Sequence, residues 1–108
     1  MEIELYRHKA NGEFTSICAQ VEEGELTLSE HDMGEFEREY SRDGEVESFV
    51  YFDNANTRKL MRTLGMKGNG ALLDVLKRRF KKYEASMKCE ICYFCDEHAI
   101  KYTTQVYY

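Results

Sequence analysis

The spacing of apolar residues changes halfway along the chain, and this change constrains the fold more than any other feature. Up to about Phe52, apolar and polar residues alternate in short runs. Such alternation is typical of strands with one buried face. Beyond Asp53, apolar residues recur every three or four positions, as in amphipathic helices. A final stretch, 100–108, is again rich in β-branched and aromatic residues and predicts a last strand.

Strands first, helices next and one strand at the end predict a single α+β domain over residues 1–108. About three helices are expected to pack on one face of a mainly antiparallel sheet. The four N-terminal strands are predicted at 3–8, 13–21, 26–29 and 46–52. Asn11-Gly12 favours a tight hairpin turn between the first two strands. The strand 46–52 has apolar residues on both sides, so we expect it to be covered on both faces or to lie inside the sheet.

The remaining boundaries are predicted from capping residues and from helical spacing. Asp53 or Asn54 is expected to cap the first helix, which Gly65 ends. The second helix carries an apolar stripe over 72–83, after a joint at 68–70, and Ser86 is expected to cap the third. Between the strands, Met33, Phe36 and Tyr40 lie at helical spacing and predict one or two helical turns within 30–45.

The charges are sorted by position along the chain. Residues 22–47 hold eleven acids against Arg38 and Arg42, a net of −9. Residues 57–88 hold ten bases against Asp74 and Glu84, a net of +8, inside an overall charge of −5. Clustered charge steers encounters and selects oppositely charged surfaces.

Cys89, Cys92, Cys95 and His98 form a Cys-x-x-Cys-x-x-Cys-x-x-His pattern, which supplies ligands suited to zinc or an iron–sulfur cluster. On a helix, however, the first and third thiols lie about 120° apart around the axis. We therefore expect Cys95 in the core, Cys92 at its boundary and Cys89 exposed, with no metal and no cofactor. A metal or redox protein built on this cluster is an alternative function.

The basic run 77–83 contains Phe80 and Tyr83, which continue the apolar stripe and should point inward. The bases then form a solvated face, so direct nucleic-acid binding is not expected. The three histidines show no recognisable pairing for catalysis, and His31 is expected in a surface loop. The chain is therefore predicted not to be an enzyme. It contains neither a bilayer-length apolar stretch nor a signal peptide, which predicts a cytoplasmic location without membrane contact.

The acidic segment is the predicted binding surface for a protein partner. Its charges would steer association, and its embedded aromatic residues would anchor the complex. The predicted partner-binding residues are Glu35, Phe36, Glu37, Glu39, Tyr40, Asp43 and Glu45. The terminal strand, with aromatic residues over 102–108, offers an edge that could pair with a second copy. A monomer or a weak homodimer is therefore expected.

Several segments resemble small acidic bacterial immunity proteins of toxin–immunity systems. They are Gly24-Glu25-Leu26-Thr27-Leu28-Ser29 leading to Asp32-Met33-Gly34, Val50-Tyr51-Phe52 entering a helix, and Cys95 to Tyr102 leading to the final strand. The resemblance implies a protein that binds a toxin domain and blocks its active site. A positive cleft suited to phosphates makes a nuclease the expected toxin. The alternative is a phage-type or regulatory inhibitor of a nucleic-acid enzyme.

Overall fold

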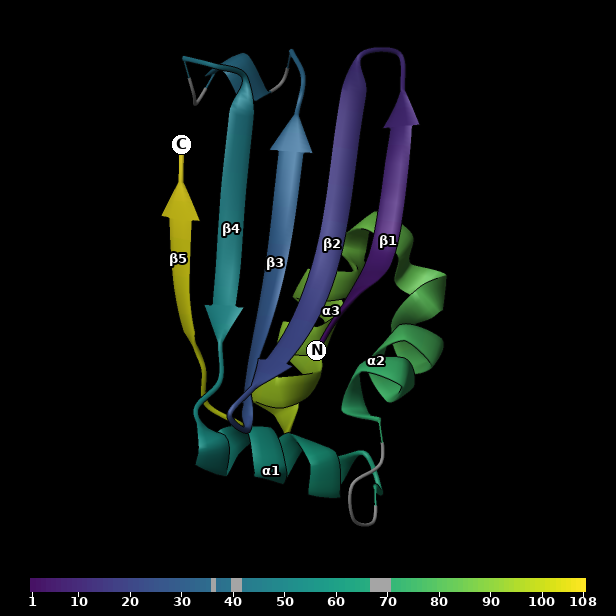
Figure 1. Cartoon of the computed structure of the whole chain (residues 1–108), viewed down its shortest axis with the longest axis vertical. Helices are drawn as coiled ribbons and strands as arrows, with labels where there is room; N and C mark the ends of the chain where they lie inside the picture. Colours follow the sequence, from purple (N-terminus) through teal and green to yellow (C-terminus); the bar gives the residue numbers. More distant parts are fainter. Residues whose placement is uncertain (36, 40–41, 67–70) are drawn as a thin grey trace.

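A five-stranded sheet forms the centre of the molecule, and each strand pairs antiparallel with the next strand along the chain (Figure 1). The computed structural model describes residues 1–35, 37–39, 42–66 and 71–108. The strands are β1 (Glu2–Ala10), β2 (Glu13–Glu22), β3 (Glu25–Met33), β4 (Glu45–Tyr51) and β5 (Thr103–Tyr107). The α+β class and the antiparallel sheet are confirmed.

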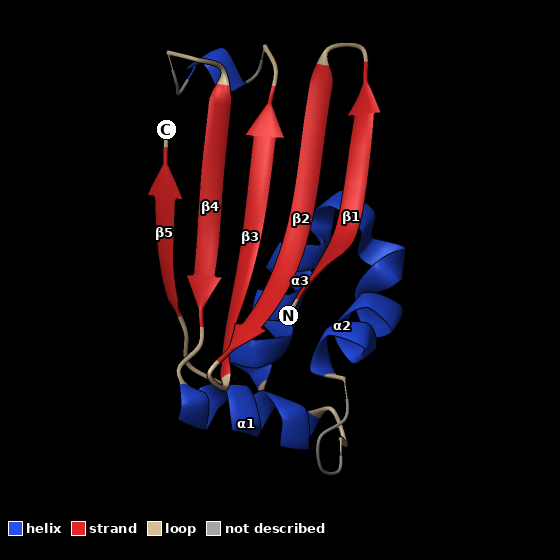
Figure 2. Ribbon diagram, in the orientation of Figure 1, coloured by secondary structure: helices blue, strands red, loops and turns tan. Residues whose placement is uncertain are grey.

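Two α-helices and a 3-10 turn cover one face of this sheet, and they lie behind the strands in Figure 2. The helix α2 (Leu72–Phe80) leads into the 3-10 turn η2 (Lys81–Ser86), which is followed by the helix α3 (Met87–Glu97). The helix α1 (Asn54–Thr63) instead lies across the lower end of the strands (Figure 1). The face thus carries two helices and a turn rather than three helices, because α1 begins directly where β4 ends.

The core fills the space between the sheet and these helices. Strand side chains that alternate toward the helices are almost completely buried: Ile17, Ala19, Leu26, Leu28 and Val50. The helices contribute an equally buried set: Leu60, Leu72, Leu73, Leu76, Phe80, Met87, Ile91 and Cys95. In β1 the register shifts between Glu4 and Tyr6, and Leu5 at this bulge is also buried. Burial of this apolar surface is the main stabilising term of the fold.

Strand β4 lies inside the sheet, between β3 and β5, as one of the two alternatives predicted. The other alternative, burial of both its faces, is wrong. Val50 and Phe52 face the core, whereas Tyr51 is 37% exposed and Phe49 is half-buried. None of the described helices covers the second face, which we call the open face. There Phe49 stacks on Tyr51, with ring centroids 6.0 Å apart.

The connection between β3 and β4 differs from the predicted helical turns. Strand β3 continues to Met33, since residues 14–22 of β2 pair with it in register, and its predicted end at residue 29 is too early. Helical structure in the connection is limited to a 3-10 turn, η1 (Glu37–Glu39), among the residues described. Phe36 and Tyr40 lie outside the described residues.

Two of the predicted caps are confirmed, and the third, Ser86, lies at the predicted N-cap position of α3 without capping it. The Asp53 carboxylate accepts a hydrogen bond from Asn56 N at 2.8 Å, and Gly65 has a φ of +78° after α1. Ser86 makes no capping hydrogen bond with its side chain. The chain instead turns into α3 at Glu84, whose φ is +48°. The predicted joint at 68–70 lies outside the described residues.

Thr57 ties α1 to the end of the sheet. Its side chain is buried, and its Oγ1 accepts a hydrogen bond from Leu26 N at 3.1 Å. The same hydroxyl donates to the Phe52 carbonyl at 3.4 Å. It therefore satisfies backbone groups of β3 and of the residue that follows β4.

Replacing Thr57 by valine should lower the free energy of unfolding by about 1–3 kcal/mol, since the shape is kept while a buried N–H loses its partner. Urea denaturation followed by circular dichroism measures this loss. Thr63→Val is the matched control, because the half-buried Thr63 hydroxyl only donates back to the Lys59 carbonyl within α1. Equal losses for the two variants would contradict the role given to Thr57.

Candidate functional site

The β3–β4 connection carries the described acids of the predicted binding surface at one end of the sheet, the upper end in Figure 1. We call this surface the acidic end and define it as Glu35, Glu37, Glu39, Asp43 and Glu45. Glu35, Glu39 and Asp43 are exposed, while Glu37 and Glu45 are half-buried. All five lie at this end of the sheet, with Glu45 beside His31 on one face and Glu37 close to Glu13 and Asp32. The two predicted aromatic anchors, Phe36 and Tyr40, fall in the part of the chain that the structure does not describe.

Two glycines, Gly34 and Gly44, join the two ends of the β3–β4 connection below the acidic end. Gly34 N donates a hydrogen bond to the Gly44 carbonyl at 3.0 Å, which joins the two sides of the connection. Gly44 has a φ of +71°, and a Cβ there would lie only 3.0 Å from the Arg38 Cγ. A side chain at this position would be strained by the backbone conformation and crowded by its neighbours.

Glu13 supports the acidic end and was not predicted from the sequence. Its carboxylate, at the start of β2, accepts a hydrogen bond from Glu35 N at 3.2 Å. Burial, together with the nearby carboxylates of Glu13 and Asp32, raises the pKa of Glu37. The signal that could have revealed Glu13 is the Asn11-Gly12 turn. In an antiparallel hairpin, this turn places the start of β2 at the same end as the exit of β3.

The eleven acids of residues 22–47 do not form one surface. Glu22, Glu23 and Glu25 lie at the β2–β3 turn, at the opposite end of the strands from the acidic end. Within the acidic end, Arg38 pairs with Glu35 at 3.5 Å. Among the residues described, a single ion pair joins the acidic and basic segments, between Lys88 and Glu30 at 4.0 Å. The basic segment therefore leaves the acidic end largely uncompensated.

A half-buried polar cluster lies between the core and the acidic end, on the helix side of the sheet. Glu30 and Asp32 both face this side, and the Thr15 hydroxyl donates to Asp32 Oδ1 at 2.9 Å. Lys88, from the first turn of α3, donates to the Ser48 hydroxyl and approaches Glu30. Burial is the main cause that raises the pKa of Glu30 from about 4.5 to about 8, and Asp32 adds to the shift while Lys88 opposes it.

The cysteines take the positions predicted for a helix with one buried side. Cys95 is buried, Cys92 is half-buried and Cys89 is exposed, while His98 is exposed at the end of α3. The described residues contain no group of three or more His, Cys, Asp or Glu side chains placed to hold a metal ion. Burial raises the pKa of the Cys92 thiol and raises that of Cys95 to about 12.

The basic run also lies as predicted. Phe80 is buried and Tyr83 packs against the core, while the bases point into solvent: Lys77, Arg78, Arg79, Lys81 and Lys82. Arg79 lies over the Phe94 ring at 5.0 Å and Lys82 over the Tyr83 ring at 5.2 Å. The positive charges of these side chains thus lie along α2 and η2, away from the acidic end.

His31 lies in β3 rather than in the predicted surface loop. It faces the open face beside Phe14, with ring centroids 5.9 Å apart, while its neighbour Asp32 points to the helix side. The nearest carboxylate to its Nε2 is that of Glu45, at 3.9 Å, which is too far for a hydrogen bond. The pleat of the strand thus separates His31 from Asp32.

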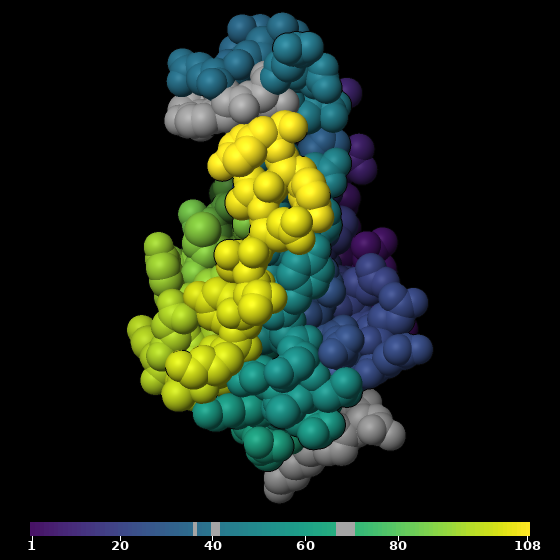
Figure 3. Space-filling view, turned by 90° about the vertical axis from the view of Figure 1, so that its left-hand side faces the viewer, coloured from purple at the N-terminus to yellow at the C-terminus, as the bar shows by residue number. Residues whose placement is uncertain are grey.

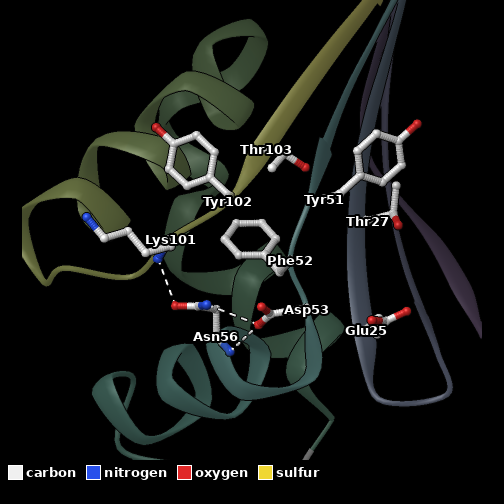
Figure 4. A pocket seen from close by; sticks show the side chains of 9 residues that line it. All are labelled: Glu25, Thr27, Tyr51, Phe52, Asp53, Asn56, Lys101, Tyr102 and Thr103. Atoms are coloured by element: carbon white, nitrogen blue, oxygen red, sulfur yellow. Dashed lines mark hydrogen bonds between the residues drawn. The ribbon is translucent and has the colours of Figure 1, made fainter.

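A pocket of about 280 Å³ lies near α1, at the other end of the sheet from the acids (Figure 4). Three of its lining residues, Asp53, Asn56 and Lys101, are joined by hydrogen bonds. Asn56 Oδ1 accepts from Lys101 N at 2.8 Å, and Asp53 Oδ1 accepts from Asn56 Nδ2 at 3.0 Å. These bonds fasten the segment that enters β5 to the start of α1.

No family model, characterised protein or solved structure matches this chain. Within the described ranges, no helix combines the length and the apolar character needed to cross a membrane.

The pKa of Glu30 predicts a stability that falls as the pH rises from about 5 to 8. In this window the native state keeps a proton that the unfolded chain has released. Glu30→Gln stays neutral, so its free energy of unfolding, relative to the wild type, should increase by more than about 1 kcal/mol across the window. Urea denaturation at several pH values tests this, with the exposed Glu39→Gln as the control. Equal pH slopes in wild type and Glu30→Gln would contradict the assignment.

The burial of the α3 thiols predicts an order of reaction with a thiol reagent such as iodoacetamide. Cys89 should react first, because it is exposed, and Cys95 last, because its buried thiol resists ionisation. Peptide mass spectrometry of a time course at pH 8 measures the order. Cys89→Ser should remove the fastest α3 site and leave the slower ones unchanged. Labelling of Cys95 as fast as Cys89 would show that α3 does not pack as described.

Proposed function

We propose that this protein is a non-catalytic protein-binding module, an immunity or inhibitor protein that blocks a basic, nuclease-like toxin domain with its acidic end. The observation that carries the proposal is the gathering of five carboxylates at one end of the sheet. The sequence of residues 34–45 contains two basic residues, Arg38 and Arg42, and Arg38 is already paired with Glu35.

The shape of the molecule supports this use of the acidic end. The molecule measures about 43 × 25 × 23 Å, and the acids lie at one end of its long axis (Figure 1). A narrow charged end can enter a concave cleft that a flat face could not reach. Nuclease clefts are positive because they receive phosphates, so carboxylates placed there compete for the same cations.

The separation of charge supports fast association. Exposed charges farther apart than about 10 Å are screened at 0.1 M salt, so a steering field has to be concentrated. The basic segments α2 and η2 lie behind the sheet and away from the acidic end (Figure 1). A basic partner therefore meets uncompensated negative charge at this end first.

Reversing two charges in the acidic end should disrupt binding. The variant Glu37→Lys/Glu39→Lys should associate with the basic partner at least about tenfold more slowly at low salt and with a weaker salt dependence. The matched control is Glu22→Lys/Glu25→Lys, which makes the same change in net charge at the opposite end of the sheet. That control should bind like the wild type.

The measurement begins with affinity capture of the tagged protein from its native cells at low and high salt, followed by mass spectrometry. The proposal expects a basic protein that the wild type and the control retain and the charge-reversed variant loses. Stopped-flow binding and cleavage of duplex DNA by that purified protein then test steering and inhibition. Equal association rates for all three forms, or a partner whose activity is not inhibited, would contradict the proposal.

A further inference from the structure

Strand β5 leaves one edge of the sheet open. It is the last strand in the sheet order, and its outer edge faces the viewer in Figure 3. All five of its residues are exposed, with 44% exposure for Val106 and 50% for Tyr107. An edge strand presents unpaired backbone N–H and C=O groups to any strand that can approach it.

The two edges of this sheet are built differently. Strand β1, at the other edge, carries Glu2, Glu4, Arg7 and Lys9, and its register shifts beside Leu5. Charges and bulges are the devices that keep edge strands from pairing. Strand β5 reads Thr-Thr-Gln-Val-Tyr, without a charge, a glycine or a proline. Its β-branched and aromatic residues favour strand pairing.

The open face continues up to this unprotected edge as an aromatic row. Tyr107 meets Phe49 edge to face, with ring centroids 5.6 Å apart, and Phe49 stacks on Tyr51. The row ends at β5, so Tyr107 is covered on its β4 side and exposed on the other. A further strand beside β5 would cover it.

We propose that β5 pairs antiparallel with β5 of a second copy, about a two-fold axis through Gln105, to give a continuous ten-stranded sheet. In this register Gln105 meets Gln105 of the second copy, and Thr104 meets its Val106. Thr103 meets Tyr107 of the second copy, which repeats the Tyr51–Thr103 pair found between β4 and β5. Cross-strand pairs of aromatic and β-branched residues stabilise sheets.

Charge favours a second copy as the occupant. Within Thr103–Tyr107, pairing of two identical strands brings no like charges together, because neither strand carries a charge. In the neighbouring strand β4, Glu47 pairs with Tyr107, so the register places it in a row with Thr103 and Tyr51 of the other copy. The two copies of Glu47 therefore lie at opposite ends of the contact and do not face each other. The proposal does not depend on the partner of the acidic end.

The contact is short and should be reversible. Five residues on each side bury less than the roughly 1,200 Å² that stable interfaces require. The wild type should therefore change from one chain of 12.8 kDa to two chains as its concentration rises. Sedimentation velocity up to about 1 mM covers the corresponding affinities.

Opposite charges at Gln105 test both the occupant and the register. Gln105→Lys alone and Gln105→Glu alone should each lose the dimer, because two like charges then face each other across the axis. An equimolar mixture of the two variants should recover a dimer that contains one copy of each. His8→Lys, on the exposed β1 edge, is the matched control and should dimerise like the wild type. Circular dichroism confirms that each variant is folded.

Three outcomes would overturn the proposal. The first is a wild-type mass of one chain at every concentration. The second is a dimer that either single variant forms as well as the wild type does. The third is loss of the dimer in both variants without recovery in the mixture, which would exclude pairing about Gln105.

Discussion

The pleat of the strands is the constraint on which the rest of the structure depends. Successive side chains point to opposite faces, so burying Ile17 and Ala19 under the helices turns Cys18 to the open face. A shift of register by one residue would exchange the two sets and expose the core, so burial fixes the pairing of the strands. The same alternation leaves Phe49 and Tyr51 on the open face.

The helices cover only the lower part of the sheet in Figure 1, and this gives the molecule two chemically different regions. Below, apolar side chains fill the space between the sheet and α2 and α3. Above, Glu30 and Asp32 occupy the helix side of β3, and Lys88 is the cation that approaches Glu30. The acidic end begins beyond this boundary. Along β3 the apolar core therefore ends after Leu28, and charged side chains follow it toward the acidic end.

Sequence reasoning succeeded where the signal was local. The period of the apolar residues predicted the α+β class. The cap at Asp53, the helix end at Gly65 and the order of cysteine burial in α3 were also predicted correctly, because each depends on neighbours within one or two helical turns. It failed where distant residues decide. Strand β3 extends through polar residues, since β2 supplies its register. The common location of the five described acids at one end of the sheet followed from their closeness in the chain. Glu13 was missed because it is 22 residues from Glu35 in sequence.

The acidic end and the β5 edge belong to different elements, so the two proposed contacts are compatible. The acids lie on the β3–β4 connection, whereas the edge is formed by Thr103–Tyr107. Two-fold antiparallel pairing of β5 would direct the acidic ends of the two copies in opposite directions along the joined sheet. Such a dimer could hold two basic partners without contact between them. It would increase avidity only for a partner that presents two basic clefts on one assembly, because separate partners gain no effective concentration from the pairing.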